Sequence, residues 1–207
     1  MNAQTEALQI AGPSGPLEVA VDRPVADAKG TAVIAHPHPL FGGTLSNKVV
    51  QTLARAFVQS GWTSVRFNFR GVGASAGVHD EGRGELDDML AVVDACAPQG
   101  RLSLAGFSFG AFVTSHAVER LHAQREIDQV VLVGTAASRF NVANVPEELH
   151  LRTLVIHGEQ DDTVPLASVM DWARPQTLPV LVVPAGAHFF HGQLPLLRAL
   201  VTRHLSA

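Results

Sequence analysis

The sequence is poor in several residue types, and each shortage excludes a class of protein. It has one cysteine and no tyrosine among 207 residues. A lone cysteine forms no disulfide within the chain and builds no cysteine-based zinc site. Cys96 lies in an apolar segment, so we expect a small, buried hydrophobic residue. No apolar run approaches the ~18 residues of a membrane-spanning helix.

Positive charge is also scarce. Lys and Arg number 15 against 19 Asp and Glu, a net charge of −4, so neither a nucleic acid nor a membrane is expected as a partner. The first residues, MNAQTEALQI, show no basic patch followed by an apolar core, which predicts no secretory signal and a soluble cytoplasmic protein. With 46% hydrophobic residues the chain supports a core, and its length predicts one domain over residues 1–207.

Short apolar runs alternate with segments of helical periodicity. Strands are predicted at 31–35, 63–69, 102–107, 129–135, 153–157 and 180–183, with an edge strand at 17–21. Those at 31–35, 129–135 and 153–157 are apolar runs typical of strands buried on both faces. Helices are predicted at 47–60, 84–97, 109–122, 166–174 and 193–205. Repeated strand–helix–strand units indicate an α/β fold with a mostly parallel sheet and helices on both faces. Functional residues are then expected at the carboxyl ends of the strands.

Two segments fit the pattern G-x-S-x-G. Gly106–Gly110 stands between an apolar run and a helical pattern, which is the context of a nucleophile elbow. Gly73–Gly77 is followed by the polar, glycine-rich VHDEGRGE. We therefore predict Ser108 as the nucleophile and Ser75 as a loop residue that bonds to backbone.

The glycine-rich segment 71–76 also fits G-x-G-x-x-A, a fingerprint of dinucleotide sites. No helix opens at its last position. The acid expected about 20 residues further on would be Asp94, which lies on a predicted helix rather than at a strand end. A nucleotide site is therefore not expected, and no cofactor is predicted.

A serine hydroxyl needs a histidine to take its proton and an acid to orient that histidine. In hydrolases with such an elbow, the catalytic histidine follows the serine and the acid along the chain. The remaining candidates are His188, His191 and His204. His188 lies directly after the last predicted strand, whereas His204 lies in the final helix. His191 begins that helix and is interpreted as a wall residue or a cap. We predict His188 as the base.

The acid is expected in HGEQDDTVP, which follows the strand at 153–157 and offers three carboxylates. Together with GFSFG and AGAHFFH, this segment resembles the α/β-hydrolase superfamily. There the pattern H-G-x-x-D-x-x-V-P places the acid at the fifth position. The resemblance thus implies Asp161 as the acid, with Asp162 as the alternative.

Motifs of the N-terminal half make the resemblance more specific. HPHPLFGGT, RFNFRGVGASAG and the segment around Asp80 and Glu85 resemble a family of small bacterial α/β-hydrolases. That family is related to the dienelactone hydrolases but uses serine rather than cysteine. The similarity runs from about Thr31 to the C-terminal helix. It implies an α/β-hydrolase fold and hydrolase chemistry without naming a substrate.

Attack on a carbonyl builds negative charge on its oxygen, which two backbone N–H groups normally hold. Phe109, the residue after the nucleophile at a helix N-terminus, is expected to supply one. The loop HPHPLFGG supplies the second, and since proline has no N–H, His38 and Leu40 remain. The superfamily pattern favours His38, and the alternating prolines leave Leu40 open.

The histidines offer one more interpretation. His36 and His38, with His188 and His191, resemble a ligand set for zinc. No acid follows His38 closely and His188 already has a role, so no metal is predicted. Arg70 and the acidic segment 80–88 are interpreted as a salt-bridged loop that shapes the floor of the site.

The connection at 136–152, where the superfamily usually inserts a cap, is too short for a folded lid. We therefore expect no cap domain and an open, shallow site walled by Phe41, Phe109, Phe140 and Phe189. Such a site suits small acyl esters, or an acyl group on a larger carrier.

The sequence thus predicts a serine hydrolase that cleaves small-molecule esters or thioesters through an acyl-enzyme intermediate. Ser108, Asp161 and His188 form its predicted triad. The alternatives are a non-catalytic binding protein on a hydrolase fold, and a peptidase or amidase. The sequence leaves both a monomer and a homodimer open.

Overall fold

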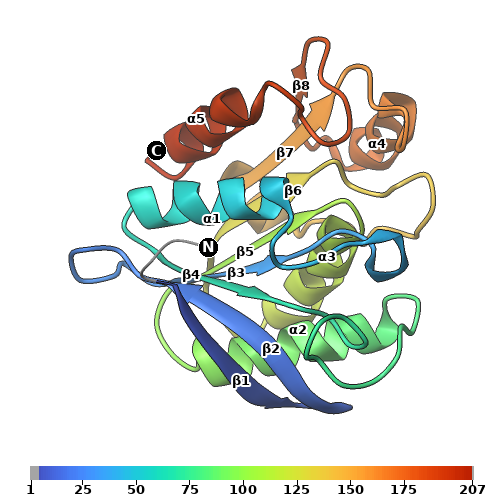
Figure 1. The fold of residues 1–207 in the computed structure, drawn as a ribbon. Helices are drawn as coiled ribbons and strands as arrows, with labels where there is room; N and C mark the ends of the chain where they lie inside the picture. Colours follow the sequence, from blue (N-terminus) through green and yellow to red (C-terminus); the bar gives the residue numbers. More distant parts are fainter. Residues whose placement is uncertain (1–4, 207) are drawn as a thin grey trace.

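The computed structural model of the protein describes residues 5–206. The predicted domain spans residues 1–207, so its first four residues and its last residue lie outside this range. The first four also belong to the N-terminal segment in which we expect no secretory signal. Within residues 5–206, eight strands form one sheet in the order β1-β2-β4-β3-β5-β6-β7-β8 (Figure 1). The strands are β1 (Glu6–Gly12), β2 (Gly15–Asp22), β3 (Thr31–Ala35), β4 (Thr63–Phe67), β5 (Leu102–Phe107), β6 (Ile127–Val133), β7 (Thr153–Gly158) and β8 (Val180–Val183).

Helices occupy most of the predicted helical segments. The α-helices are α1 (Lys48–Gln59), α2 (Arg83–Cys96), α3 (Phe109–Leu121), α4 (Leu166–Ala173) and α5 (Leu194–His204). Three short 3-10 helices accompany them: η1 (Pro39–Phe41), η2 (Glu147–Arg152) and η3 (Arg174–Gln176). None of the helices within residues 5–206 is both long and apolar enough to cross a membrane.

The predicted parallel sheet is confirmed for β3 to β8, which all run parallel to one another. The predicted edge position of residues 17–21 was wrong. They belong to β2, which pairs antiparallel with β1 on one side and with β4 on the other. β1 is the edge strand on that side of the sheet, and β8 lies at the other edge. The sequence analysis missed β1. Its register with β2 follows from the tight turn at residues 13–14, so the pairing rather than a long apolar pattern defines this strand.

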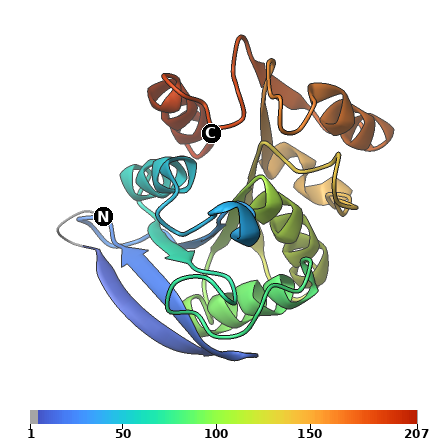
Figure 2. The ribbon, with the colours of Figure 1, turned by 45° about the vertical axis from the view of Figure 1, so that its right-hand side comes forward.

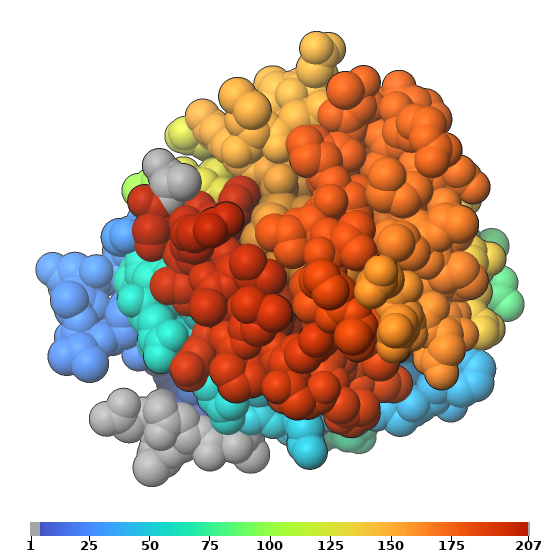
Figure 3. All heavy atoms as spheres, turned by 90° about the horizontal axis from the view of Figure 1, so that it is seen from above, coloured from blue at the N-terminus to red at the C-terminus, as the bar shows by residue number. Residues whose placement is uncertain are grey.

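Two apolar clusters lie on the two faces of the sheet. Along β3, Ala32 and Ile34 face the cluster that α1 and α5 cover, whereas Val33 and Ala35 face the cluster that α2, α3 and α4 cover. Figure 2 shows these two helical layers on either side of the strands. Because both faces are buried, the central strands appear in the sequence as continuous apolar runs. Seen from above, the chain from β7 to α5, orange to red, covers most of that side (Figure 3).

Cys96 departs from the prediction of full burial. It is half-buried at the last position of α2 and packs against the edge of the core. Since the helix ends there, the side chain sits at the margin of the layer rather than beneath it. Partial burial raises the pKa of its thiol.

The connection from β6 to β7 holds only η2 in addition to loop. No cap domain is therefore inserted between these strands, which lie wholly within residues 5–206, as the short connection predicted.

Candidate active site

Ser108 lies on a strained turn between β5 and α3. Its φ of 58° and ψ of −117° are unfavourable for a residue with a Cβ, at a cost of ~1–3 kcal/mol. The two glycines of the motif make this turn possible. A Cβ at Gly106 would lie 2.3 Å from the carbonyl oxygen of Gly110, and a Cβ at Gly110 would lie 2.4 Å from that of Ala35. The pattern at 106–110 is therefore a strand–turn–helix elbow.

His188 lies between Ser108 and Asp161. Its Nε2 is 3.0 Å from Ser108 Oγ, and its Nδ1 is 2.7 Å from Asp161 Oδ2. All three residues are buried. The structure thus brings the three predicted residues into one hydrogen-bonded line, although they come from the ends of three different strands: β5, β7 and β8.

The surroundings of Asp161 keep its carboxyl ionised. Its Oδ1 accepts hydrogen bonds from the N–H groups of Thr163 and Val164, at 3.0 and 2.7 Å. Burial alone would raise the pKa of Asp161, but the hydrogen bond with His188, that with Val164 and the two neighbouring histidines together lower it. An ionised Asp161 accepts from His188 Nδ1–H, which leaves His188 Nε2 to accept from the hydroxyl of Ser108.

The loops that carry Asp161 and His188 are tied to each other. A Cβ at Gly158 would lie 2.3 Å from the carbonyl oxygen of Gly186, so the two backbones meet where only glycine fits. The N–H of Gln160 donates to Gly186 O at 2.9 Å, and the N–H of Ala185 donates to Glu159 Oε2 at 2.9 Å. These contacts hold the acid and the histidine at a fixed separation.

The other acid and histidines that the sequence offered for the triad lie outside the hydrogen-bonded line. Asp162 is exposed and only its neighbour Thr163 bonds to its side chain, at 3.3 Å. His204 lies at the end of α5, as expected. The prediction that His191 begins or caps that helix was wrong. The N-cap is Gln193, because a turn through Gly192, with φ of 74°, separates His191 from the helix.

The second G-x-S-x-G segment is a loop, as predicted. The Ser75 hydroxyl donates to Asn68 O at 2.7 Å and accepts from the N–H of Glu18 at 2.9 Å. The Glu18 carboxylate in turn accepts from the N–H of Ala74 at 2.9 Å. The glycine-rich segment is therefore held by hydrogen bonds to its own chain.

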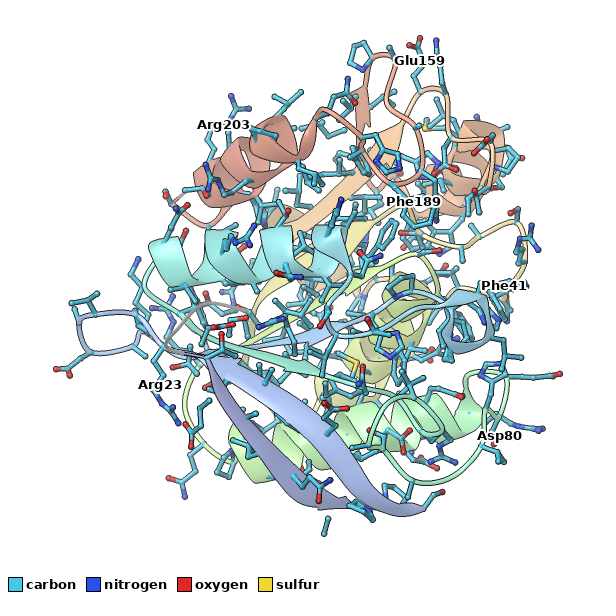
Figure 4. The ribbon with its side chains drawn as sticks, in the orientation of Figure 1. Arg23, Phe41, Asp80, Glu159, Phe189 and Arg203 are labelled. Carbon is cyan, nitrogen blue, oxygen red and sulfur yellow. The ribbon has the colours of Figure 1, made fainter. Side chains whose placement is uncertain are left out.

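A cavity of about 290 Å³ opens beside Ser108. The four predicted walls, Phe41, Phe109, Phe140 and Phe189, all line it. Figure 4 shows Phe41 and Phe189 on the same side of the molecule, beyond the carboxyl ends of the parallel strands. Their exposed fractions of 79% and 43% show that these two walls form an open rim.

The loop after β3 brings His38, but not Leu40, to this cavity. The N–H of Leu40 donates to His38 Nδ1 at 3.2 Å, and the Leu40 side chain is 69% exposed. Because His38 Nδ1 accepts this bond, the proton of its neutral ring is on Nε2. Burial, His79 and Arg139 all lower the pKa of His38, so the ring is neutral near pH 7.

The floor beneath His38 is the polar loop between β4 and α2. Arg70 and Asp88 form a buried bidentate ion pair, with N–O distances of 3.0 and 2.8 Å, which confirms the predicted salt-bridged loop. The sequence analysis missed His79. Its ring centroid lies 4.8 Å from that of His38, and its Nδ1 lies 2.8 Å from Glu85 Oε1.

Three further polar residues, Asn47, Arg139 and Thr163, line the cavity and were not predicted there. Asn47 caps α1 through its Oδ1, which accepts from the N–H groups of Val49 and Val50. Arg139 lies in the loop after β6. The available signals were a cap residue before the helical pattern and an arginine in a short connection, but neither shows by itself which cavity a side chain reaches.

Residues 16–126 match the family model described as X-Pro dipeptidyl-peptidase (S15 family). This stretch contains the elbow at Ser108 and ends before the loops of Asp161 and His188. The chain also resembles an uncharacterised protein of Rickettsia prowazekii, with 39% identity over 113 residues. The match covers 53% of this chain and 48%, about half, of that relative.

Similarity to solved structures extends over nearly the whole chain. An α/β serine hydrolase without lid from Xanthomonas campestris is 39% identical, with a TM-score of 0.88 over 100% of this chain and 95% of the other. An α/β serine hydrolase homologue from Coxiella burnetii is 40% identical, with a TM-score of 0.82 over 97% of both chains.

Proposed function

This chain belongs to the α/β serine hydrolases, the superfamily of its lidless relatives and of the S15 family that it matches, and we propose that it hydrolyses small carboxylic esters or thioesters. The observation that carries the proposal is the hydrogen-bonded line from Asp161 through His188 to Ser108, at the bottom of an open aromatic cavity. This arrangement suits acyl transfer to a serine hydroxyl.

The proposed reaction has two halves. Ser108 Oγ attacks the acyl carbon while His188 Nε2 takes its proton, and Asp161 stabilises the imidazolium that forms. His188 then returns the proton to the departing alkoxide or thiolate, which leaves an acyl-enzyme on Ser108. A water molecule repeats the attack with His188 as base, and the acid product leaves as the Ser108 hydroxyl is restored.

We assign the oxyanion hole to the N–H groups of Phe109 and His38. Phe109 is the first residue of α3, so its N–H has no partner within the helix and benefits from the helix dipole. Of the two candidates in the other loop, Leu40 already donates its N–H to His38 Nδ1 and lies outside the cavity lining. Loss of one such donor costs about 10²- to 10³-fold in rate.

The cavity favours short acyl groups. Its volume of about 290 Å³ is at the lower end of small-molecule sites, which span about 300–1,000 Å³. The aromatic walls bury an acyl chain, while the open rim lets a larger alcohol or thiol portion extend into solvent.

Peptidase activity is the second candidate, because the matched family model is that of X-Pro dipeptidyl-peptidases. An enzyme that removes dipeptides must recognise a free α-ammonium, and carboxylates are its natural partners. Among the described residues that line the cavity, no Asp or Glu is present. The lining therefore favours esters over dipeptidyl substrates.

Labelling with a fluorophosphonate probe tests the proposal, followed by assays with p-nitrophenyl butyrate and with a Gly-Pro p-nitroanilide. We expect an adduct on Ser108 and turnover of the ester. Ser108→Ala should lose labelling and lower ester turnover on the order of 10⁶-fold. Ser75→Ala, at the other G-x-S-x-G segment, serves as the matched control and should retain labelling. A folded protein without an adduct would favour the binding-protein alternative, and a preference for the anilide would favour the peptidase.

A further inference from the structure

Among the described residues that line the cavity, Arg139 is the only one with a permanent positive charge. It is exposed, and no carboxylate of residues 5–206 lies within ion-pair distance of it. Because guanidinium groups hold carboxylates in planar, bidentate hydrogen bonds, an uncompensated arginine beside an aromatic cavity is suited to a carboxylate that arrives with the substrate.

The backbone under Arg139 is fixed. The N–H groups of Arg139 and Phe140 both donate to Ala136 O at 3.1 Å. The Phe140 ring stacks on Phe112, with a centroid distance of 4.7 Å and an interplanar angle of 18°, and lies 5.2 Å from Phe109. The backbone therefore holds Arg139 at a constant position on the rim, so that only its side chain has to be ordered when a ligand binds.

The other polar groups of the lining also favour an anion. His38 presents Nε2–H as a donor, since its Nδ1 accepts from Leu40. Asn47 uses its oxygen to cap α1, so the amide NH₂ is the part of its side chain that the cap leaves unused. The hydroxyl of Thr163 donates to Asp162 Oδ1. The nearby Asp161 lies outside the lining, and both of its oxygens are engaged. The lining thus combines one cation with hydrogen-bond donors.

We propose that Arg139 is a specificity-determining residue that binds a carboxylate on the substrate, so that the preferred esters carry a second, anionic group besides the scissile bond. This inference rests on the proposed function, because it names the substrate class of the same site. Arg139 takes no part in the chemistry of Ser108. Its effect is on binding, and therefore on KM.

Matched pairs of esters that differ by one carboxylate test this inference. In the first pair, monomethyl glutarate carries a carboxylate at the end of its acyl chain, and methyl pentanoate carries a methyl group there instead. In the second pair, the butanoyl ester of 3-hydroxypropanoate carries the carboxylate on the leaving group, and propyl butanoate lacks it. The acid released is measured with each pair for the wild type, for Arg139→Gln and for Arg203→Gln. Arg203 is an exposed arginine far from the rim (Figure 4), so its variant loses the same charge elsewhere.

We expect the wild type to prefer the anionic member of at least one pair, and the pair identifies the side on which the carboxylate binds. In Arg139→Gln the ratio of kcat/KM for the anionic to the neutral ester should fall about tenfold, through KM rather than kcat. Arg203→Gln should keep the wild-type ratio. Arg139→Lys should retain part of the preference, and raising the salt concentration should reduce it.

Equal ratios in the wild type and Arg139→Gln for both pairs, with the neutral esters still turned over, would overturn the inference and leave the proposed function standing. An equal fall in Arg203→Gln would also overturn it, because net charge rather than position would then be responsible. Failure of the wild type to hydrolyse any ester or to label at Ser108 would instead count against the proposed function.

Discussion

His36 Nε2 accepts a hydrogen bond from the N–H of Phe69 at 3.0 Å, and this bond joins the loop after β3 to the loop that follows β4. The other ring nitrogen, Nδ1, lies 2.6 Å from the carbonyl oxygen of Pro37 and donates to it. Only the neutral ring satisfies both partners. Burial lowers the pKa of His36 from 6.5 to about 4, so the loop that carries His38 depends on an uncharged histidine.

The first prediction concerns the pH dependence of stability. The neutral His36 contributes fully above about pH 6.5. As the pH falls from there towards 4, the unfolded chain binds a proton that the folded protein does not, so the contribution is lost. The loss approaches about 1.4 kcal/mol per pH unit, and it amounts to about 1.6 kcal/mol between pH 6.5 and 5. Urea denaturation at both pH values measures it.

His36→Gln separates this histidine from the other titrating groups. The variant should be less stable than the wild type at pH 7 because it loses the bond to Phe69, yet its stability should fall less between pH 6.5 and 5. Burial lowers the pKa of His157 as well, so some pH dependence should remain. An unchanged slope in His36→Gln would contradict the assignment.

The second prediction distinguishes the two adjacent acids. Asp161→Asn keeps the shape of the side chain but removes the charge that faces His188, so kcat should fall about 10⁴-fold. Asp162→Asn changes an exposed carboxyl that bonds only to Thr163, and its kcat should stay near that of the wild type. Hydrolysis of p-nitrophenyl butyrate measures both. Similar losses in the two variants would refute the assignment of Asp161.

The third prediction concerns the loop that holds the second oxyanion donor. A Cβ at Gly43 would lie 1.9 Å from the carbonyl oxygen of Pro37, so Gly43→Ala must displace the backbone next to His38. We expect kcat to fall about 10²-fold, the effect of losing one oxyanion donor.

Gly42→Ala is the control for this loop. A Cβ there meets nothing within 4 Å, although its φ of 78° adds some strain. Its kcat should fall much less than that of Gly43→Ala. Equal kcat values in the two variants would show that the loop position does not matter for the reaction.

The fourth prediction concerns the floor of the site. Asp88 is fully buried and accepts three hydrogen bonds from Arg70, two from the guanidinium and one from the backbone N–H. Asp88→Ala leaves a largely buried cation without its partner, which costs about 3–5 kcal/mol. Chemical denaturation measures the change. Asp80→Ala removes the partner of the exposed Arg83 and should leave the midpoint of unfolding unchanged.

Much of the fold was predictable because it depends on local patterns of apolar and polar residues. The apolar run at 31–35 became β3 with the same ends, and the periodic segment at 47–60 became α1 with Asn47 as its cap. The elbow around Ser108 follows from two glycines that clear space for one strained residue. β1 was missed because its position depends on pairing with β2, and the local pattern of apolar residues does not predict that pairing.

The sequence by itself determined the strand–helix alternation, the elbow and the residues that follow each strand, because these depend on backbone preferences and spacing over a few positions. Only the tertiary structure decided which of those residues meet. It places His79 beside the ring of His38 and brings Arg139 to the same cavity as Ser108. Such contacts join residues tens of positions apart. They depend on how the layers pack over the sheet, and no short stretch of sequence encodes that packing.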